Sequence, residues 1–315
     1  MKNVIVIVGP TAVGKTKLSI ELAKCLKSEV ISGDSMQVYK GMDIGTGKVT
    51  AEEKAGIPHH MLDIKYPDEP FSTAEYQRLV RSSIEKINEK EKIPILVGGS
   101  GLYIKSVLYD YDFTNRKRNT HITKKLEKRL KEEGKEALYR ELKQIDAEQA
   151  KKIHPNNIRR VIRALEIYET TGFTMTEIHK QQETSPIYNH FIIGLEMERE
   201  TLYNQINNRV DKMLEEGLVK EVARLYESGY EDCQSMKAIG YKELIPYVKG
   251  ETDLETATET LKRNSRRYAK RQYTWFKNQM DINWYHIAAE KADPFLAILN
   301  EAEQRFTTKY SKRCY

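Results

Sequence analysis

The sequence of 315 residues has few cysteines and no long apolar run. Its three cysteines, Cys25, Cys233 and Cys314, lie far apart and lack a CxxC or Cys/His spacing, so the sequence contains no zinc motif. Cysteines this few and this scattered are typical of proteins from a reducing compartment. The apolar stretch at residues 4–8 is too short for a signal peptide or a membrane span. We therefore expect a cytoplasmic protein without a membrane partner.

Charge of one sign is not in large excess either. Lys and Arg number 52 against 46 Asp and Glu, which gives a net charge of +6. Because this mean excess is small, the distribution of charge along the chain is more informative about partners than the sum. The length allows two domains, or one large domain that carries an insertion, with a substantial core in either case.

The first hundred residues alternate between strand and helix patterns. Residues 4–8 form a continuous β-branched run, which is typical of a strand buried on both faces of a parallel sheet. Ser72 and Glu75 have capping-box spacing and are expected to begin a helix. The alternation predicts an α/β fold with a doubly wound parallel sheet. The other elements expected here are helices at 17–27 and 72–90 and strands at 29–32 and 93–97.

The composition changes near residue 115. From 116 to about 180 the sequence is highly charged and helix-forming, with only short apolar stripes. Residues 191–195 are again apolar, which predicts a return to the sheet. The expected domains are a first part of the α/β core at 1–115, a helical insertion at 116–190, and a return to the core with C-terminal basic helices at 191–315. Within the last part we expect helices at 199–214, 218–228, 241–247 and 254–279 and a strand at 282–286.

Residues 9–16 match the phosphate-binding pattern GxxxxGK[ST]. The match lies between the first strand and the first helix, which is the context in which the pattern is meaningful. The glycines let backbone N–H groups converge on phosphate oxygens, and the helix N-terminus adds its positive dipole. Lys15 can neutralise phosphate charge, and the Thr16 hydroxyl can bind Mg²⁺. The expected phosphate-binding residues are Gly9, Pro10, Thr11, Ala12, Val13, Gly14, Lys15 and Thr16.

The loop does not by itself identify the reaction. A kinase or NTPase usually holds Mg²⁺ with an acid at the end of a neighbouring strand, but the strand at 93–97 is followed by Gly98 and Gly99. The acid that does follow a strand is Asp34. Because the carboxyl ends of the strands line the ligand crevice of a doubly wound sheet, Asp34 is expected to face the phosphate site. A turn or N-cap aspartate would have the same spacing.

Seven segments in the same order resemble the bacterial tRNA dimethylallyltransferases, and together they cover most of the chain. The phosphate loop is shared by many enzymes, whereas the segment around Asp34 and the basic, aromatic segment near the C-terminus are specific. The matching segments are GPTAVGKT from Gly9, SGDSMQVYKGMDIGTGK from Ser32, PHHMLDI from Pro58, LVGGSGLY from Leu96, RALEIYETTG from Arg163, AIGYKE from Ala238 and RRYAKRQYTWFKNQ from Arg266.

The resemblance implies that the loop binds the diphosphate of dimethylallyl diphosphate, and that the allyl group passes to N6 of the adenosine immediately 3′ of the anticodon in tRNA. An adenine amino group is a poor nucleophile, so a carboxylate that accepts its N–H bond favours attack, and Asp34 is the expected base. Lys15, the loop N–H groups and Mg²⁺ at Thr16 would stabilise the leaving diphosphate. The family pattern adds Arg209 to these catalytic residues.

Two basic segments are candidates for contact with tRNA. The expected helix at 254–279 has a basic face with interleaved aromatic residues, which suits the phosphate backbone, although a solvated helix face looks similar. Trp275 and Phe276 are expected to pack in the core. The insertion has a cluster of three arginines, and the family commonly has Gln where this chain has Arg159. The expected tRNA-binding residues are Asp34, Ser35, Met36, Gln37, Ser100, Gly101, Arg159, Arg160, Arg163, Lys237, Arg263, Arg267, Lys270 and Arg271.

Three other functions are compatible with the loop. A small-molecule kinase would need a nucleoside triphosphate, and an adenylate isopentenyltransferase would use free AMP and need neither the insertion nor the basic helix. A non-catalytic RNA-binding protein would use the loop only as an anion site. A pattern match alone would assign ATP to the loop, and we expect ATP binding to be incidental. The expected cofactor is Mg²⁺, the expected partners are dimethylallyl diphosphate and the tRNA anticodon stem-loop, and the expected state is a monomer.

Overall fold

A computed structural model describes residues 1–111, 119–181, 185–287 and 295–307 of the chain. The chain divides into two compact units. The first consists of Met1–Leu108 and Ile187–Tyr315, and the second of Tyr109–Pro186. Each unit has a hydrophobic cluster of its own. The predicted boundary between residues 115 and 116 lies outside the described residues.

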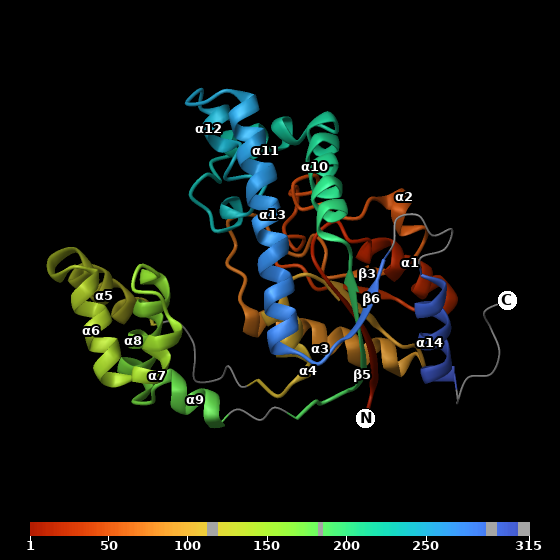
Figure 1. Ribbon diagram of the computed structural model, residues 1–315, viewed down its shortest axis with the longest axis horizontal. Coiled ribbons are helices and arrows are strands. Elements are labelled where there is room, and N and C mark those ends of the chain that lie inside the picture. Colours follow the sequence, from red (N-terminus) through yellow and green to blue (C-terminus); the bar gives the residue numbers. More distant parts are fainter. Residues whose placement is uncertain (112–118, 182–184, 288–294, 308–315) are drawn as a thin grey trace. The chain divides into compact units, whose positions relative to one another are not determined.

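The first unit is built around a six-stranded sheet in which all strands are parallel, with the order β3-β2-β4-β1-β5-β6 (Figure 1). β1 is an interior strand of this sheet, and its side chains from Val4 to Val8 are fully buried on both faces. The predicted doubly wound parallel sheet is therefore confirmed. The strands are β1 (Asn3–Val8), β2 (Val30–Ser32), β3 (His59–His60), β4 (Ile95–Gly98), β5 (Asn189–Glu196) and β6 (Asn283–His286).

Helices cover the sheet and supply the walls of the site. Ile5 and Ile7 point to one face of the sheet, where they share a cluster with apolar residues of α1 and α14. In α3 the buried residues recur every three to four positions, which is the period of one helix face. The helices of this unit are α1 (Lys15–Cys25), α2 (Ala51–Lys54), α3 (Thr73–Glu89), α4 (Gly101–Leu108), α10 (Arg199–Glu215), α11 (Leu218–Glu227), α12 (Ile245–Val248), α13 (Leu254–Gln279) and α14 (Leu296–Thr307).

The second unit consists of helices, as the sequence predicted. Its cluster contains leucines from several of these helices together with Val161 and Leu165. The Asp146 carboxylate caps α7 through Gln149 N–H (3.0 Å) and binds both the N–H (2.9 Å) and the hydroxyl (2.6 Å) of Thr176. The helices are α5 (Thr120–Glu133), α6 (Lys135–Ile145), α7 (Ala147–Lys152), α8 (Ile158–Thr171) and α9 (Met175–Gln181).

Two local predictions were wrong. The helix expected at 241–247 is only α12, because a helix that began at Tyr241 would place Pro246 in its interior, whereas in α12 this proline lies in the first turn. The expected capping box of α3 is only half present. Ser72 accepts from Glu75 N–H (3.1 Å), but the Glu75 carboxylate pairs with Lys65 (3.0 Å).

No helix in the described part of the chain combines the length and the apolar character that crossing a membrane would require.

Candidate active site

The carboxyl ends of three neighbouring strands meet at one cavity of about 400 Å³. β1 leads into the phosphate loop, β2 leads into Asp34, and β4 ends at Gly98. α10 and α13, which lie side by side in Figure 1, contribute Arg209 and Gln272 to the cavity wall. This is the crevice at which doubly wound sheets bind their ligands.

Lys15 is the first residue of α1 and lines the cavity. Its ammonium group donates to the Pro10 carbonyl oxygen at 2.6 Å, so the side chain folds back over the loop. Burial and, to a smaller extent, the nearby Arg209 charge lower the pKa of Lys15 to about 7, while the Asp34 charge acts in the opposite direction. Two cations and one carboxylate therefore share this end of the cavity.

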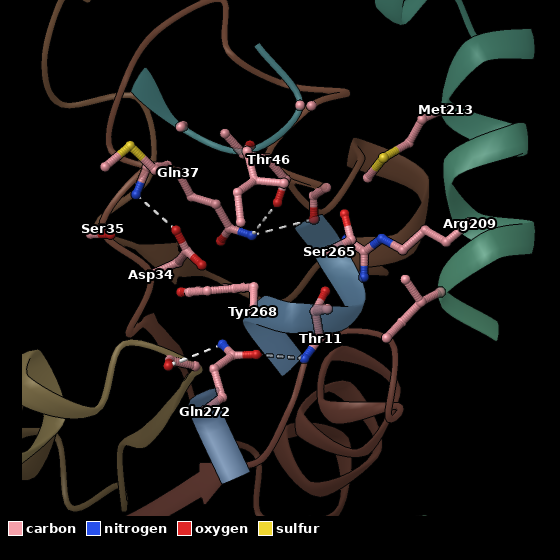
Figure 2. A pocket seen from close by; sticks show the side chains of 18 of the residues that line it. Thr11, Asp34, Ser35, Gln37, Thr46, Arg209, Met213, Ser265, Tyr268 and Gln272 are labelled. Atoms are coloured by element: carbon pink, nitrogen blue, oxygen red, sulfur yellow. Dashed lines mark hydrogen bonds between the residues drawn. The ribbon is translucent and has the colours of Figure 1, made fainter. Parts of the chain in front are cut away.

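Asp34 directly follows Gly33 at the end of β2 and points toward Tyr268 (Figure 2). Its Oδ1 atom accepts from Met36 N–H at 2.7 Å, which is the hydrogen bond of an Asx turn. Burial raises the pKa of the Asp34 carboxyl. Asp34 is thus both a turn residue and a cavity residue, because the turn fixes its carboxylate at the cavity.

Arg209 lies on α10 with its guanidinium group at the cavity. Burial lowers the pKa of Arg209, and the Asp34 charge opposes this shift. Gly47 lies so close to the guanidinium that a Cβ atom at this position would collide with it. The arginine is therefore enclosed by the segment that follows Asp34, in a region where its charge is poorly screened.

Gln272 is a cavity residue that the sequence analysis missed. Its side chain Oε1 accepts from Thr11 N–H at 2.9 Å, and its Nε2 donates to the Gly99 carbonyl oxygen at 3.1 Å (Figure 2). One carboxamide from α13 thereby joins the phosphate loop to the residue that follows β4. The sequence signal was weak: a long polar side chain on the face of the helix that carries its buried residues.

Glu221 is a second residue that the sequence analysis missed. Its carboxylate accepts from the N–H groups of Asp43 (3.0 Å), Ile44 (2.9 Å) and Gly45 (3.0 Å), and from the Tyr241 hydroxyl (2.7 Å). These bonds fix the segment 43–47, of which Gly45, Thr46 and Gly47 line the cavity. A buried carboxylate with four donors needs no further partner.

The predicted tRNA contacts near Asp34 fall into two groups. Ser35, Met36 and Gln37 line the cavity, but the Gln37 carboxamide is engaged with Ser32 Oγ (2.8 Å) and the Thr46 and Gly47 carbonyl oxygens (3.4 and 3.3 Å). Ser100 and Gly101 are not among the cavity residues. Ser100 Oγ accepts from Ser35 N–H at 3.3 Å, and Gly101 packs against the Trp275 ring.

The predicted basic positions are mostly exposed. Lys237 and Arg271 are exposed and line the cavity, and Arg271 lies 5.6 Å from the centre of the Tyr268 ring. Phe276 is fully buried, whereas Trp275 is half-buried. In the second unit, Arg163 pairs with the buried Glu166 at 2.9 Å. The other predicted basic residues, Arg159, Arg160, Arg263, Arg267 and Lys270, are exposed.

The side-chain oxygen atoms at the cavity suit a metal cation that is held mainly by a phosphate-containing substrate. Among the described residues there is no group of three or more His, Cys, Asp or Glu side chains that could hold a metal ion. Mg²⁺ needs only one or two protein oxygens when phosphates and waters complete its shell. Thr16 and Asp34 both line the cavity and could provide such oxygens.

Known proteins match this chain along most of its length. A family model described as IPP transferase matches residues 37–279. The chain is 57% identical to the tRNA dimethylallyltransferase of Bacillus cytotoxicus over 91% of its length and 90% of that protein. The protein of the same name from Bacillus pumilus is 54% identical over 94% of this chain and 95% of its own.

Solved structures are similar to it as well. The crystal structure of the full-length tRNA isopentenylpyrophosphate transferase from Bacillus halodurans matches with a TM-score of 0.74 and 49% identity, and 97% of each chain is covered. A eukaryotic dimethylallyltransferase, captured in crystallographic snapshots of its action on tRNA, matches with a TM-score of 0.83 and 33% identity. That match covers 96% of this chain and 78% of the other.

Proposed function

The chain belongs to the IPP transferase family, and we propose that it transfers a dimethylallyl group from dimethylallyl diphosphate to N6 of the adenosine immediately 3′ of the anticodon in tRNA, with release of diphosphate. The observation that carries this proposal is the joint presence of a phosphate loop, a carboxylate and an arginine in one cavity. The position after β4, where a phosphoryl-transfer enzyme has its acid, is glycine.

The donor half of the site stabilises a leaving diphosphate. Lys15 and Arg209 bring two positive charges to the cavity, and loop N–H groups together with the start of α1 add oriented dipoles. The negative charge on the diphosphate increases as the C–O bond breaks. These groups therefore bind the transition state more tightly than the intact donor.

The acceptor half of the site contains Asp34 as the base. A carboxylate that accepts a hydrogen bond from the N6 amino group increases the electron density on nitrogen as the new C–N bond forms. Burial raises the pKa of Asp34, which makes it a stronger proton acceptor. The adenosine must leave its stack to reach this depth, and unpaired loop nucleotides do so at low cost.

Mg²⁺ fits this site as a partner of the diphosphate. The Thr16 hydroxyl would hold it, with phosphate oxygens and water completing the shell. When bound, the cation would neutralise part of the charge on the leaving group.

The proposed RNA contacts follow from exposure and charge. Arg263, Arg267 and Lys270 form an exposed basic face on α13, and Arg159 and Arg160 form another on α8. Such faces bind the phosphate backbone without reading sequence. We expect a monomer to be active, because the phosphate loop, Asp34 and Arg209 of the proposed site belong to the same chain. We expect it in the cytoplasm, where its tRNA substrate is used.

A label-transfer assay tests the reaction against phosphoryl transfer. Purified protein is incubated with Mg²⁺, unmodified tRNA and dimethylallyl diphosphate labelled in the allyl group. We expect the label to enter RNA without ATP being present. ATP turnover with no label in RNA would identify a kinase and overturn the proposal.

An acceptor competition separates tRNA from free adenylate. An anticodon stem-loop and AMP are offered together with the labelled donor. We expect the label in the stem-loop, since the exposed basic faces have no use with a mononucleotide. Preferred labelling of AMP would indicate an adenylate isopentenyltransferase instead.

A further inference from the structure

Gln272 closes one end of the phosphate loop. Its carboxamide lies between the loop and the segment after β4, and only 6% of the residue is exposed. We propose that Gln272 makes the loop selective for a diphosphate over a triphosphate, because it occupies an amide that a longer phosphate chain would need. The inference rests on the proposed function, in which the loop holds a diphosphate leaving group.

The contact is specific on both sides of the carboxamide. Thr11 N–H donates to Oε1 at 2.9 Å, and Nε2 donates to the Gly99 carbonyl oxygen at 3.1 Å. A Cβ atom on residue 99 would collide with Nε2, so the side chain fits this gap only because Gly99 has no side chain. Both polar ends of the carboxamide are satisfied by backbone groups, which fixes its orientation.

Phosphate loops bind phosphate chains through successive backbone N–H groups and the loop lysine. Thr11 lies four residues before Lys15, the first residue of α1, and only Gly9 precedes it as a backbone donor of the loop, because Pro10 has no N–H group. With the Thr11 N–H engaged by Gln272, the loop offers fewer donors, and its far end is filled by a side chain. A diphosphate can use the remaining donors, whereas the third phosphate of a triphosphate meets a neutral amide.

Charge alone would give the opposite preference. Lys15 and Arg209 attract a triphosphate more strongly than a diphosphate, because the triphosphate carries more negative charge. A loop of this pattern with two cations nearby and all its N–H groups free would therefore bind nucleoside triphosphates well. Gln272 reverses this preference, because it engages the Thr11 N–H group and occupies space beside the loop.

Direct binding of inorganic anions tests the inference. Affinities for diphosphate and tripolyphosphate are measured by calorimetry on the full chain with Mg²⁺ at fixed concentration. Gln272→Met keeps the side-chain volume and frees the Thr11 N–H. We expect it to raise the affinity for tripolyphosphate relative to diphosphate by about tenfold, the value of one hydrogen bond to a charged group. Gln279→Met, an exposed glutamine on the same helix, should leave the ratio unchanged.

An unchanged ratio in folded Gln272→Met protein would overturn the inference. If thermal melts show that the variant does not fold, the wild-type chain decides the question by NMR. On addition of diphosphate, the Thr11 amide signal should shift less than those of Gly14, Lys15 and Thr16. A shift at Thr11 as large as theirs would be contrary evidence. The prenyl-transfer assay is separate from both measurements, so failure of the proposed function remains distinguishable from failure of this inference.

Discussion

Asp34 is the residue whose replacement should separate chemistry from binding. Asp34→Asn keeps an oxygen for the Met36 N–H bond, so the turn should persist, but it removes the proton acceptor. We expect the transfer rate to fall by about a hundredfold or more while tRNA affinity is retained. Single-turnover kinetics and a filter-binding assay measure the two quantities. Asp281→Asn, at an exposed aspartate, is the matched control, and equal loss of binding and rate would refute the role of Asp34.

The shifted pKa values predict a bell-shaped pH profile. Asp34 must be deprotonated, so kcat/KM should rise with pH through a pKa above its ordinary value of 3.8. Lys15 must be protonated, so kcat/KM should fall as pH increases through about 7. Bound diphosphate adds negative charge beside Lys15 and raises its pKa, which should move the alkaline limb of kcat to higher pH. In Lys15→Arg the guanidinium stays charged and this limb should disappear; if it persists, Lys15 is not its source.

Sequence reasoning placed at one site the residues whose sequence signals are local. Lys15 and Thr16 belong to a contiguous motif, and Asp34 follows a strand, so periodicity and position were enough to bring them to one cavity. Gln272 and Glu221 gave no such signal. Gln272 contacts a residue 261 positions away and Glu221 contacts residues 176 to 178 positions away, and only the folded chain brings these groups together.

Among the elements, α13 has a buried face and an exposed basic face. Residues such as Leu261, Ala269 and Phe276 are buried along one face, and Gln272 on that face reaches the phosphate loop. Its bounds were predicted from the sequence without error, because a long periodic segment with an Asp253 cap gives a strong signal. β3, with two residues, was not predicted, because a segment this short shows no periodicity.

The basic face of α13 should determine how tRNA binding responds to salt. Arg267→Glu with Lys270→Glu removes two expected phosphate contacts, so the slope of log affinity against log salt should become shallower by about two units. Titrations at several salt concentrations measure the slope. Lys24→Glu combined with Lys86→Glu, at exposed lysines on α1 and α3, controls for the change in net charge, because it also reverses two positive charges. An unchanged slope in the double variant would remove α13 from the RNA interface.

At the scale of the whole molecule, the chain leaves and re-enters the first unit at adjacent points. Ile187 N–H donates to the Leu108 carbonyl oxygen at 3.0 Å, so the ends that flank the second unit are already joined by a hydrogen bond. Composition predicted a helical excursion in this region. The sequence did not locate the boundary between the two units to the residue. Composition changes gradually along the chain, whereas the boundary in the structure is marked by a single hydrogen-bonded pair of residues.

This adjacency predicts the outcome of a deletion. Replacing Tyr109–Pro186 by a short Gly/Ser linker should leave the first unit folded, since the linker closes a gap that is already small. We expect calorimetry to give a diphosphate affinity within about threefold of the full chain, because the cavity residues all remain. Prenyl transfer to tRNA should fall about a hundredfold or more, the loss expected when a substrate is no longer positioned. Full transfer activity without these residues would show that the second unit has no role in tRNA binding.

In the proposed reaction, the phosphate loop holds a leaving diphosphate while Asp34 assists attack by a tRNA adenosine. Mass spectrometry of nucleosides from tRNA treated with the protein, Mg²⁺ and dimethylallyl diphosphate tests it most directly. We expect one dimethylallyl-adenosine at the position 3′ of the anticodon and one diphosphate released for each, with no nucleotide hydrolysed. Unmodified tRNA accompanied by phosphoryl transfer from ATP would contradict it.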